Sequence, residues 1–180
     1  MSQYMVEPHG RKSIRALATS FRRSLGDMDQ LHFPIVTLLD FMTVHFPNFD
    51  YEIVEDDELP WNEHAQTDIT TGHIRIKQTI YERACNGEGR DRMTIAHEIG
   101  HFFMLCFCGF TLTRTYDNAK IPSFKDPEWQ AKCFAGEFMI PKDRVEGMTV
   151  EEIVEKCGVS LEAASYQRNI YLKEAVAMDV

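Results

Sequence analysis

The segment DRMTIAHEIGHFFM, residues 91–104, contains the pattern H-E-x-x-H. Residues four apart lie on one face of an α-helix, so a helix here would present the imidazoles of His97 and His101 to a single metal ion. Glu98 lies about a third of a turn away from them, where its carboxylate can reach a water on the metal without being a ligand. The spacing therefore predicts a helix that carries two metal ligands and a general base.

The residues around the pattern support a helix that packs against other elements. The apolar side chains of the segment recur at helical spacing on one flank: Ile95, Ile99, Phe102 and Phe103. Gly100 is about 1 kcal/mol less favourable than alanine inside a helix, which indicates that something approaches closely on the ligand face. The alternative, a surface helix with two incidental histidines, is disfavoured by the rarity of the motif.

A catalytic zinc site usually has three protein ligands and one position for water or substrate. The side chains after the motif that are candidates for the third ligand are Cys106, Cys108, Asp117, Asp126, Glu128 and Glu137. We favour Glu128, because it begins a predicted helix at 127–139 on which Ala131 and Ala135 share its face and allow close packing. The rival interpretation of Glu128 is a first-turn acid that favours the helix dipole.

Composition predicts one ordinary globular domain over residues 1–180, with 44% hydrophobic and 26% charged residues. No segment approaches the roughly 20 apolar residues of a membrane span, so no membrane partner is expected. The N-terminus lacks the hydrophobic region of a signal peptide. The five cysteines are odd in number and irregular in spacing, which favours a reduced, cytoplasmic setting.

The net charge of −9 argues against direct binding of nucleic acid, which needs a positive surface. Residues 10–26 are an exception, with five basic residues and no acid. Their apolar residues recur at helical spacing, so the N-terminal segment 1–30 is predicted to contain an amphipathic helix with a basic outer face. We interpret this face as solvated and docked on an acidic body, in preference to an arm for nucleic acid or membrane.

Other patterns predict a mainly helical α+β domain with a small two- to three-stranded β-sheet. A helix is expected at 34–46, a short strand at 51–54, and a loop from 55 to 60. Residues 68–77 look like a hairpin with its turn at Thr71-Gly72, and the chain breaks at 86–89 before the motif helix.

Residues 149–175 have the outline of a helix-turn-helix. Thr149 and Glu152 form a capping-box pattern, Gly158 lies in a turn, and Ser160 begins a longer helix. Three basic residues face five acidic ones in this range, so the pair repels phosphate overall. We therefore favour packing or protein recognition over contact with DNA.

Three stretches resemble the ImmA/IrrE family of metallopeptidases: MTIAHEIGH at 93–101, E-x-x-A-x-x-F-A at 128–135, and FMIP at 138–141. The resemblance covers about residues 68–141, taken as the zinc-peptidase core. It implies a zincin-like active-site helix and a zinc ion held by His97, His101 and Glu128, with Glu98 as catalytic base. Gln130, Lys132 and Leu105 depart from the family pattern, but none is a proposed ligand.

Family members include regulators that inactivate a repressor, commonly encoded beside them on mobile elements or in stress-response loci. The resemblance thus implies a zinc-dependent endopeptidase whose partner is a protein substrate, a transcriptional repressor. Strand 73–77 could pair with an extended substrate, and the oxyanion donor is left open among His64, His73 and Tyr116. Two alternatives remain: a zinc-containing sensor or interaction module that acts without cleavage, and a DNA-binding regulator acting through 149–175.

Overall fold

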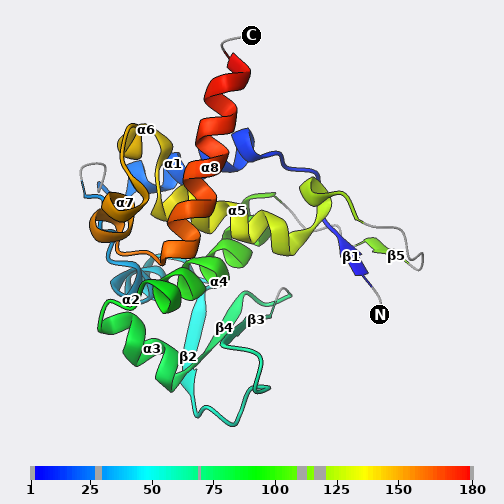
Figure 1. The fold of residues 1–180 in the computed structure, drawn as a ribbon. Coiled ribbons are helices and arrows are strands. Elements are labelled where there is room, and N and C mark those ends of the chain that lie inside the picture. The colour runs from blue at the N-terminus through cyan, green and yellow to red at the C-terminus, as the bar shows by residue number, and fades with distance from the viewer. Residues whose placement is uncertain (1–2, 27–29, 69, 109–112, 116–120, 179–180) are drawn as a thin grey trace.

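Helix α4 (Gly89–Cys108) contains the H-E-x-x-H pattern and lies between a small sheet and helix α5 (Pro127–Met139) (Figure 1). The computed structural model describes residues 3–26, 30–68, 70–108, 113–115 and 121–178. The other helices are α1 (Arg11–Ser24), α2 (Ile35–His45), α3 (Gln78–Cys85), α5 (Pro127–Met139), α6 (Lys142–Val145), α7 (Val150–Cys157), α8 (Leu161–Met178) and the 3₁₀ turn η1 (Ser123–Lys125). The strands are β1 (Gln3–Met5), β2 (Asp50–Val54), β3 (Ala65–Thr67), β4 (His73–Lys77) and β5 (Thr113–Thr115). The predicted mainly helical α+β fold is confirmed.

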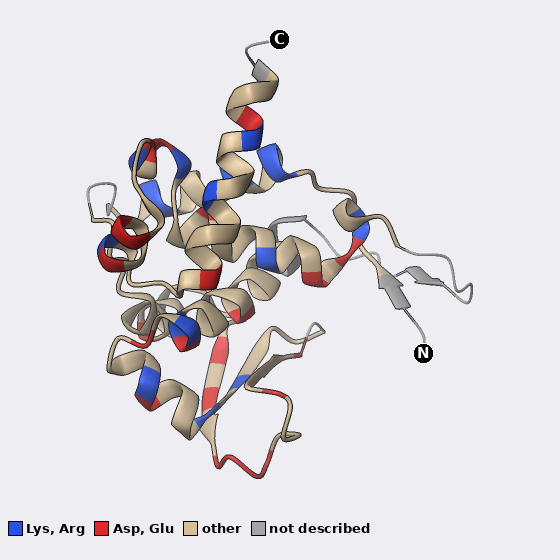
Figure 2. Cartoon of the chain, viewed as in Figure 1, with Lys and Arg blue, Asp and Glu red and all other residues tan. Residues whose placement is uncertain are grey.

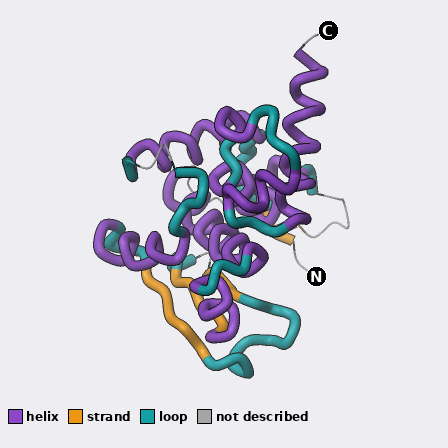
Figure 3. The backbone as a smooth tube through the Cα atoms, turned by 60° about the vertical axis from the view of Figure 1, so that its left-hand side comes forward, coloured by secondary structure: helices purple, strands orange, loops and turns teal. Residues whose placement is uncertain are grey.

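The main sheet has the strand order β2-β4-β3, with β2 parallel and β3 antiparallel to β4. It lies at one end of the molecule, beneath the helices (Figure 3). The predicted turn is confirmed, because Gly72 adopts φ 81°, although the first strand of the hairpin ends at Thr67, before the predicted start. The expectation that strand 73–77 offers an edge to a substrate is wrong: β4 is central and paired on both sides, because Ile74 and Ile76 are buried. Among the described strands, β3 is the edge nearest α4.

Several further elements were not expected from the sequence, including η1, α6, a two-stranded ribbon and helix α3. Strand β1 pairs with β5 in a separate antiparallel ribbon that joins segments about 110 residues apart. Helix α3 follows β4 without a loop and buries Ile80 and Ala84.

Aromatic rings fill the core on the side of α4 opposite its histidines. Phe103 stacks on Phe134 of α5 with ring centroids 5.2 Å apart, and Phe134 stacks on Phe138 at 5.6 Å. The ring centroid of Phe21 of α1 lies 4.0 Å from that of Phe103 and 5.5 Å from that of Phe138. This cluster fixes α4 and α5, the two helices that bear the candidate ligands, against each other.

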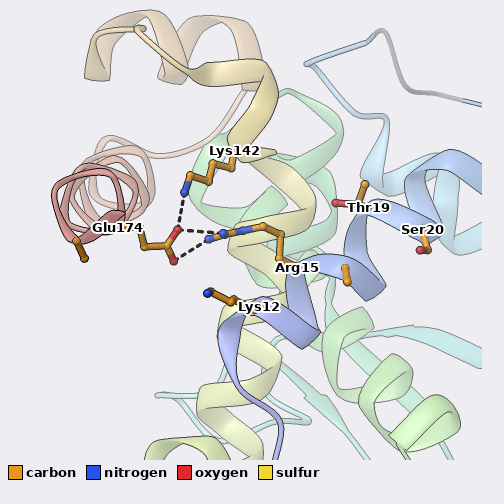
Figure 4. A pocket seen from close by; sticks show the side chains of 8 residues that line it. Lys12, Arg15, Thr19, Ser20, Lys142 and Glu174 are labelled. Carbon is orange, nitrogen blue, oxygen red and sulfur yellow. Dashed lines mark hydrogen bonds and ion pairs between the residues drawn. The ribbon is translucent and has the colours of Figure 1, made fainter. Parts of the chain in front are cut away.

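Helix α1 docks through its basic residues as well as its apolar ones. Arg11 and Arg15 pair with Glu137 of α5, whose side chain is fully buried. Arg15 also pairs with Glu174 of α8, which Lys142 contacts too (Figure 4). The prediction of a basic outer face is therefore wrong for these arginines, and the expected docking on acidic groups takes place through them.

Lysine and arginine gather where α1, α6 and α8 meet, whereas acidic residues mark the loop between β2 and β3 (Figure 2). Arg22 is also turned inward: it is buried and donates to the carbonyl of Phe138. The surface of α1 thus keeps only part of the positive charge that its sequence carries.

Helices α7 and α8 meet at the predicted turn. The Thr149–Glu152 capping box is present, and Gly158 adopts φ 62° where α7 ends. Arg168 of α8 donates to the carbonyl of Met148, so this cation is used within the pair. Within the described residues, none of the helices combines the length and apolar character that a membrane span requires.

Candidate metal centre

His97 and His101 lie one turn apart on α4 and point their rings at a common place. Their Nε2 atoms are 3.1 Å apart, and the rings are nearly perpendicular. The His101 side chain is almost fully buried, whereas that of His97 is 21% exposed. One side of the pair is thus enclosed by protein and the other faces solvent.

Glu128 approaches the two histidines from the first turn of α5. Its Oε2 lies 3.2 Å from Nε2 of His97, and its Oε1 lies 3.3 Å from Nε2 of His101. The start of α5 is fixed by Asp126, which caps the helix by accepting the Glu128 N–H at 3.0 Å, and by Pro127 in the first turn. The cap therefore determines where the Glu128 carboxylate lies.

The three side chains fit a divalent cation. Their ligand atoms all lie within 4.8 Å of one another. Bonds of about 2.0–2.1 Å to a tetrahedral ion would separate ligand atoms by roughly 3.3 Å, close to the distances found between these nitrogens and oxygens. Two imidazoles and one carboxylate are also a donor set that zinc accepts in catalytic sites.

The charges around the triad of His97, His101 and Glu128 favour the binding of a cation. Hydrogen bonds with His101 and then His97 hold the pKa of the Glu128 carboxyl well below its ordinary value, against the opposing effect of burial. Burial lowers the pKa of His101, but Glu128, and further away Glu98 and Asp126, raise it above its ordinary value. The carboxylates thus create a negative potential at the imidazoles, which favours any bound cation.

Glu98 is buried beside the triad and is not one of the three described residues whose ligand atoms converge. Thr67 of β3 contacts its carboxylate, with Oγ1 of Thr67 2.6 Å from Oε2 of Glu98. The threonine hydroxyl donates to Oε2, and the hydrogen bonds of the described residues include none to Oε1 of Glu98. Because β3 lies next to α4, Thr67 orients the Glu98 carboxylate beside the proposed ligands.

The rejected candidates have other roles or lie outside the described residues. Asp126 is the cap of α5, and Glu137 is held by Arg11 and Arg15. Asp117 lies outside the described residues, as do the side chains of Cys106 and Cys108. Of the three candidates whose side chains the structure describes, Glu128 is the one that lies next to both histidines.

Two of the three departures from the family pattern, Gln130 and Lys132, do not disturb this arrangement, and the side chain of Leu105 lies outside the described residues. Gln130 is buried and donates to the carbonyls of Glu7 and Phe124, so it ties the N-terminal segment and η1 to α5. Lys132 is exposed. Neither contacts the carboxylate of Glu128 in the structure.

The two candidate oxyanion donors that the structure describes, His64 and His73, have different neighbours. His73 faces Asp50 and Glu52 on β2, each 3.5 Å away. His64 lies just before β3 and next to Arg90, and Tyr116 is outside the described residues. We therefore assign this role to none of them.

Two positioning residues escaped the sequence interpretation. Thr67 gave no signal, because a threonine in a short strand is ordinary. Arg92 precedes the motif and donates to the carbonyls of Gly158 and Phe33, which anchors α4 to the α7–α8 turn. The sequence shows that Arg92 belongs to the family-like motif, but it does not indicate that Arg92 binds the distant carbonyls of Gly158 and Phe33.

The sequence profile of the Peptidase_M78 family, described as the IrrE N-terminal-like domain, matches residues 52–168. This range contains Glu98 and all three residues of the triad. No curated protein matches the chain.

Proposed function

The chain belongs to the Peptidase_M78 family of IrrE N-terminal-like domains, and from this premise we propose that it is a zinc-dependent endopeptidase that cleaves a protein partner. The observation that carries the proposal is the convergence of His97, His101 and Glu128 beside the buried carboxylate of Glu98. Such an arrangement suits hydrolysis of a peptide bond, in which a water must lose a proton as it attacks.

His97, His101 and Glu128 would hold the zinc ion. When bound, zinc would supply Lewis acidity, lowering the pKa of water and polarising a peptide carbonyl. The partial exposure of His97 and Glu128 leaves an approach for substrate from the solvent side. The burial of His101 keeps the opposite side closed.

Glu98 acts as the general base in this proposal. The Thr67 contact at Oε2 restrains the carboxylate and leaves Oε1 to accept a proton from the attacking water. Glu98 then returns the proton to the leaving amine. Thr67 is a positioning residue, because it acts on the reaction through Glu98 alone.

The outer edge of β3 is the proposed binding edge for an extended substrate. The His64 carbonyl accepts from the Lys77 N–H, and the Asp68 N–H donates to the His73 carbonyl, so these positions face β4. Backbone groups alternate along an antiparallel strand, and those of Ala65 and Thr67 therefore point to the outer edge. A substrate strand paired there would pass next to Glu98.

We further propose that the substrate is a transcriptional repressor and that its cleavage regulates genes of a mobile element or stress response in the cytoplasm. The resemblance to ImmA/IrrE metallopeptidases supports this choice of partner. A regulator that only binds the repressor, with zinc as a structural ion, would have the same triad but would not need Glu98 as a base.

The test compares wild type with Glu98→Gln, using a repressor encoded beside the gene for this chain. The amide cannot accept the proton, so cleavage should fall by about 10²–10⁴-fold while zinc content and thermal stability are retained. Glu88→Gln, an exposed acid just before α4, is the matched control and should cleave normally. Fragments are followed by mass spectrometry and repression by release of operator DNA. Equal relief of repression by both proteins without fragments would exclude the peptidase function and leave the binding-only regulator.

A further inference from the structure

An exposed cation lies on the same face of α4 as the two histidines. Arg90, Thr94, His97 and His101 follow one another at spacings of four, three and four residues, which places them along one side of the helix. The Arg90 guanidinium contacts Nε2 of His64 at 3.4 Å, and no carboxylate of the described residues pairs with it. A chain of net charge −9 thus keeps an arginine unneutralised on its ligand-bearing face.

Strand β3 connects this cation to the proposed base. Thr67 contacts Glu98 at one end of the strand, and His64 contacts Arg90 at the other. Three residues of strand span about 10 Å, and the eight residues of helix from Arg90 to Glu98 span about 12 Å. Because His64 lies next to Arg90 and Thr67 next to Glu98, β3 and α4 run alongside each other in the same direction. Arg90 is therefore roughly 10 Å from the carboxylate of Glu98.

A substrate lying along the outer edge of β3 would reach Arg90 about three residues from the bond that is cleaved, because an extended chain advances about 3.3 Å per residue. Arginine presents a planar set of donors that matches a carboxylate in two parallel hydrogen bonds. The half-buried imidazole of His64 limits the directions in which the guanidinium can turn. These features suit an acidic group better than an apolar or basic one.

We propose that Arg90 and His64 form a subsite that binds a carboxylate of the substrate about three residues from the scissile bond. The inference rests on the proposed peptidase function and adds the chemical class that the enzyme selects. If the substrate runs antiparallel to β3, the carboxylate lies on the C-terminal side of the cut; if parallel, it lies on the N-terminal side. The carboxylate is supplied by an aspartate or glutamate side chain, or by the C-terminus of a peptide.

The experiment incubates zinc-loaded wild type, Arg90→Glu and Arg23→Glu with a peptide library made by digesting a proteome, and identifies the cuts by mass spectrometry. Arg23 is an exposed arginine on α1, away from the centre, and makes the same charge change. Wild type and Arg23→Glu should show enrichment of aspartate and glutamate at one position near the cut. Arg90→Glu should lose this enrichment and favour lysine or arginine there.

Synthetic peptides then measure how much the acidic residue contributes to kcat/KM. A glutamate-to-lysine exchange at that position should lower kcat/KM about tenfold for wild type, because attraction is replaced by like-charge repulsion. The preference should weaken in 0.5 M salt. Peptides with an amidated C-terminus distinguish the two sources of the carboxylate. A preference that survives amidation comes from an acidic side chain, and one that disappears comes from the C-terminal carboxylate.

Two results would overturn the subsite while leaving the peptidase function intact: cleavage without any acidic preference, or a preference unchanged in Arg90→Glu. Absence of cleavage by zinc-loaded wild type, with the library and with the repressor alike, would overturn the proposed function and this inference with it. Thermal unfolding and zinc content of each variant establish that a changed preference arises in a folded, metal-loaded protein.

Discussion

Gly100 of α4 lies against the backbone of Ala131 of α5 so closely that a Cβ atom on Gly100 would be 2.8 Å from the Ala131 carbonyl oxygen. The glycine sits one residue before His101, and Ala131 lies one turn after Glu128. The approach of the two backbones therefore sets the distance between the histidines and the carboxylate.

Gly100→Ala should loosen this junction. Alanine is favoured over glycine inside a helix by about 1 kcal/mol, but the methyl group would force α4 and α5 apart at a fully packed contact. We expect a net loss of about 1–3 kcal/mol in the free energy of unfolding, together with weaker zinc binding. Urea unfolding and zinc titration measure both effects. Gly10→Ala, where the added methyl meets nothing within 4 Å, is the control; a Gly100→Ala protein as stable as wild type would contradict the close contact.

Glu128→Ala should remove one of three proposed ligands. Loss of an outer partner of a metal ligand typically weakens binding about 10–100-fold, so loss of a ligand should weaken it by more than about 100-fold. Elemental analysis after dialysis against buffered zinc measures the occupancy. Lys132→Ala on the same helix is exposed and should keep its zinc. Full occupancy in Glu128→Ala would rule out this residue as the third ligand.

Glu174 should contribute stability that depends on pH. Burial raises its pKa, but hydrogen bonds from Arg15 and Lys142 outweigh this and lower the pKa to about 2. A lowered folded-state pKa gives stability that is complete above the unfolded value of about 4.5 and is lost as pH falls towards 2. Because these side chains are partly exposed, we expect Glu174→Gln to cost about 1 kcal/mol at pH 7 and much less at pH 2.5.

Urea unfolding of wild type and Glu174→Gln at the two pH values tests this. Glu155→Gln, an exposed acid on α7, should match wild type at both. A difference between wild type and Glu174→Gln that is the same at pH 7 and pH 2.5 would show that the effect is not ionic.

The α7–α8 pair should not bind DNA tightly in a sequence-specific way. Arg168 is engaged with the carbonyl of Met148, and acidic residues outnumber basic ones across residues 149–175. Fluorescence anisotropy with operator fragments at physiological salt should detect only weak binding. Nanomolar affinity that is abolished by Arg168→Glu would instead make this pair a DNA reader.

Elements with local signals were predicted well from the sequence. The bounds of α5 were predicted correctly because Asp126-Pro127 marks its start and Pro141 follows its end. The capping box of α7 and the Gly72 turn were likewise encoded within a few residues. The shared face of His97 and His101 and the close approach at Gly100 could be predicted from helix geometry alone.

The remainder depends on contacts between distant segments. Helix α3 has too few apolar residues to show a period, since its buried side chains are Ile80 and Ala84. Nothing near Gln3 indicates a partner near Thr115, and nothing near Thr67 indicates Glu98. The inward turn of the α1 arginines could not be seen without Glu137, because sequence patterns assign charged residues to the outside by default.

The burial of Glu137 also bears on where the folding unit ends. This carboxylate lies within the matched range 52–168, but two of its cationic partners, Arg11 and Arg15, and the Tyr171 hydroxyl lie outside that range. A truncation to residues 52–168 would leave a charge in the interior without a counter-ion, at a cost of about 3–5 kcal/mol, a large share of the stability of a small domain. The segment that defines the family is thus shorter than the network of partners around Glu137. We therefore expect a minimal version of this protein to need both α1 and the second half of α8.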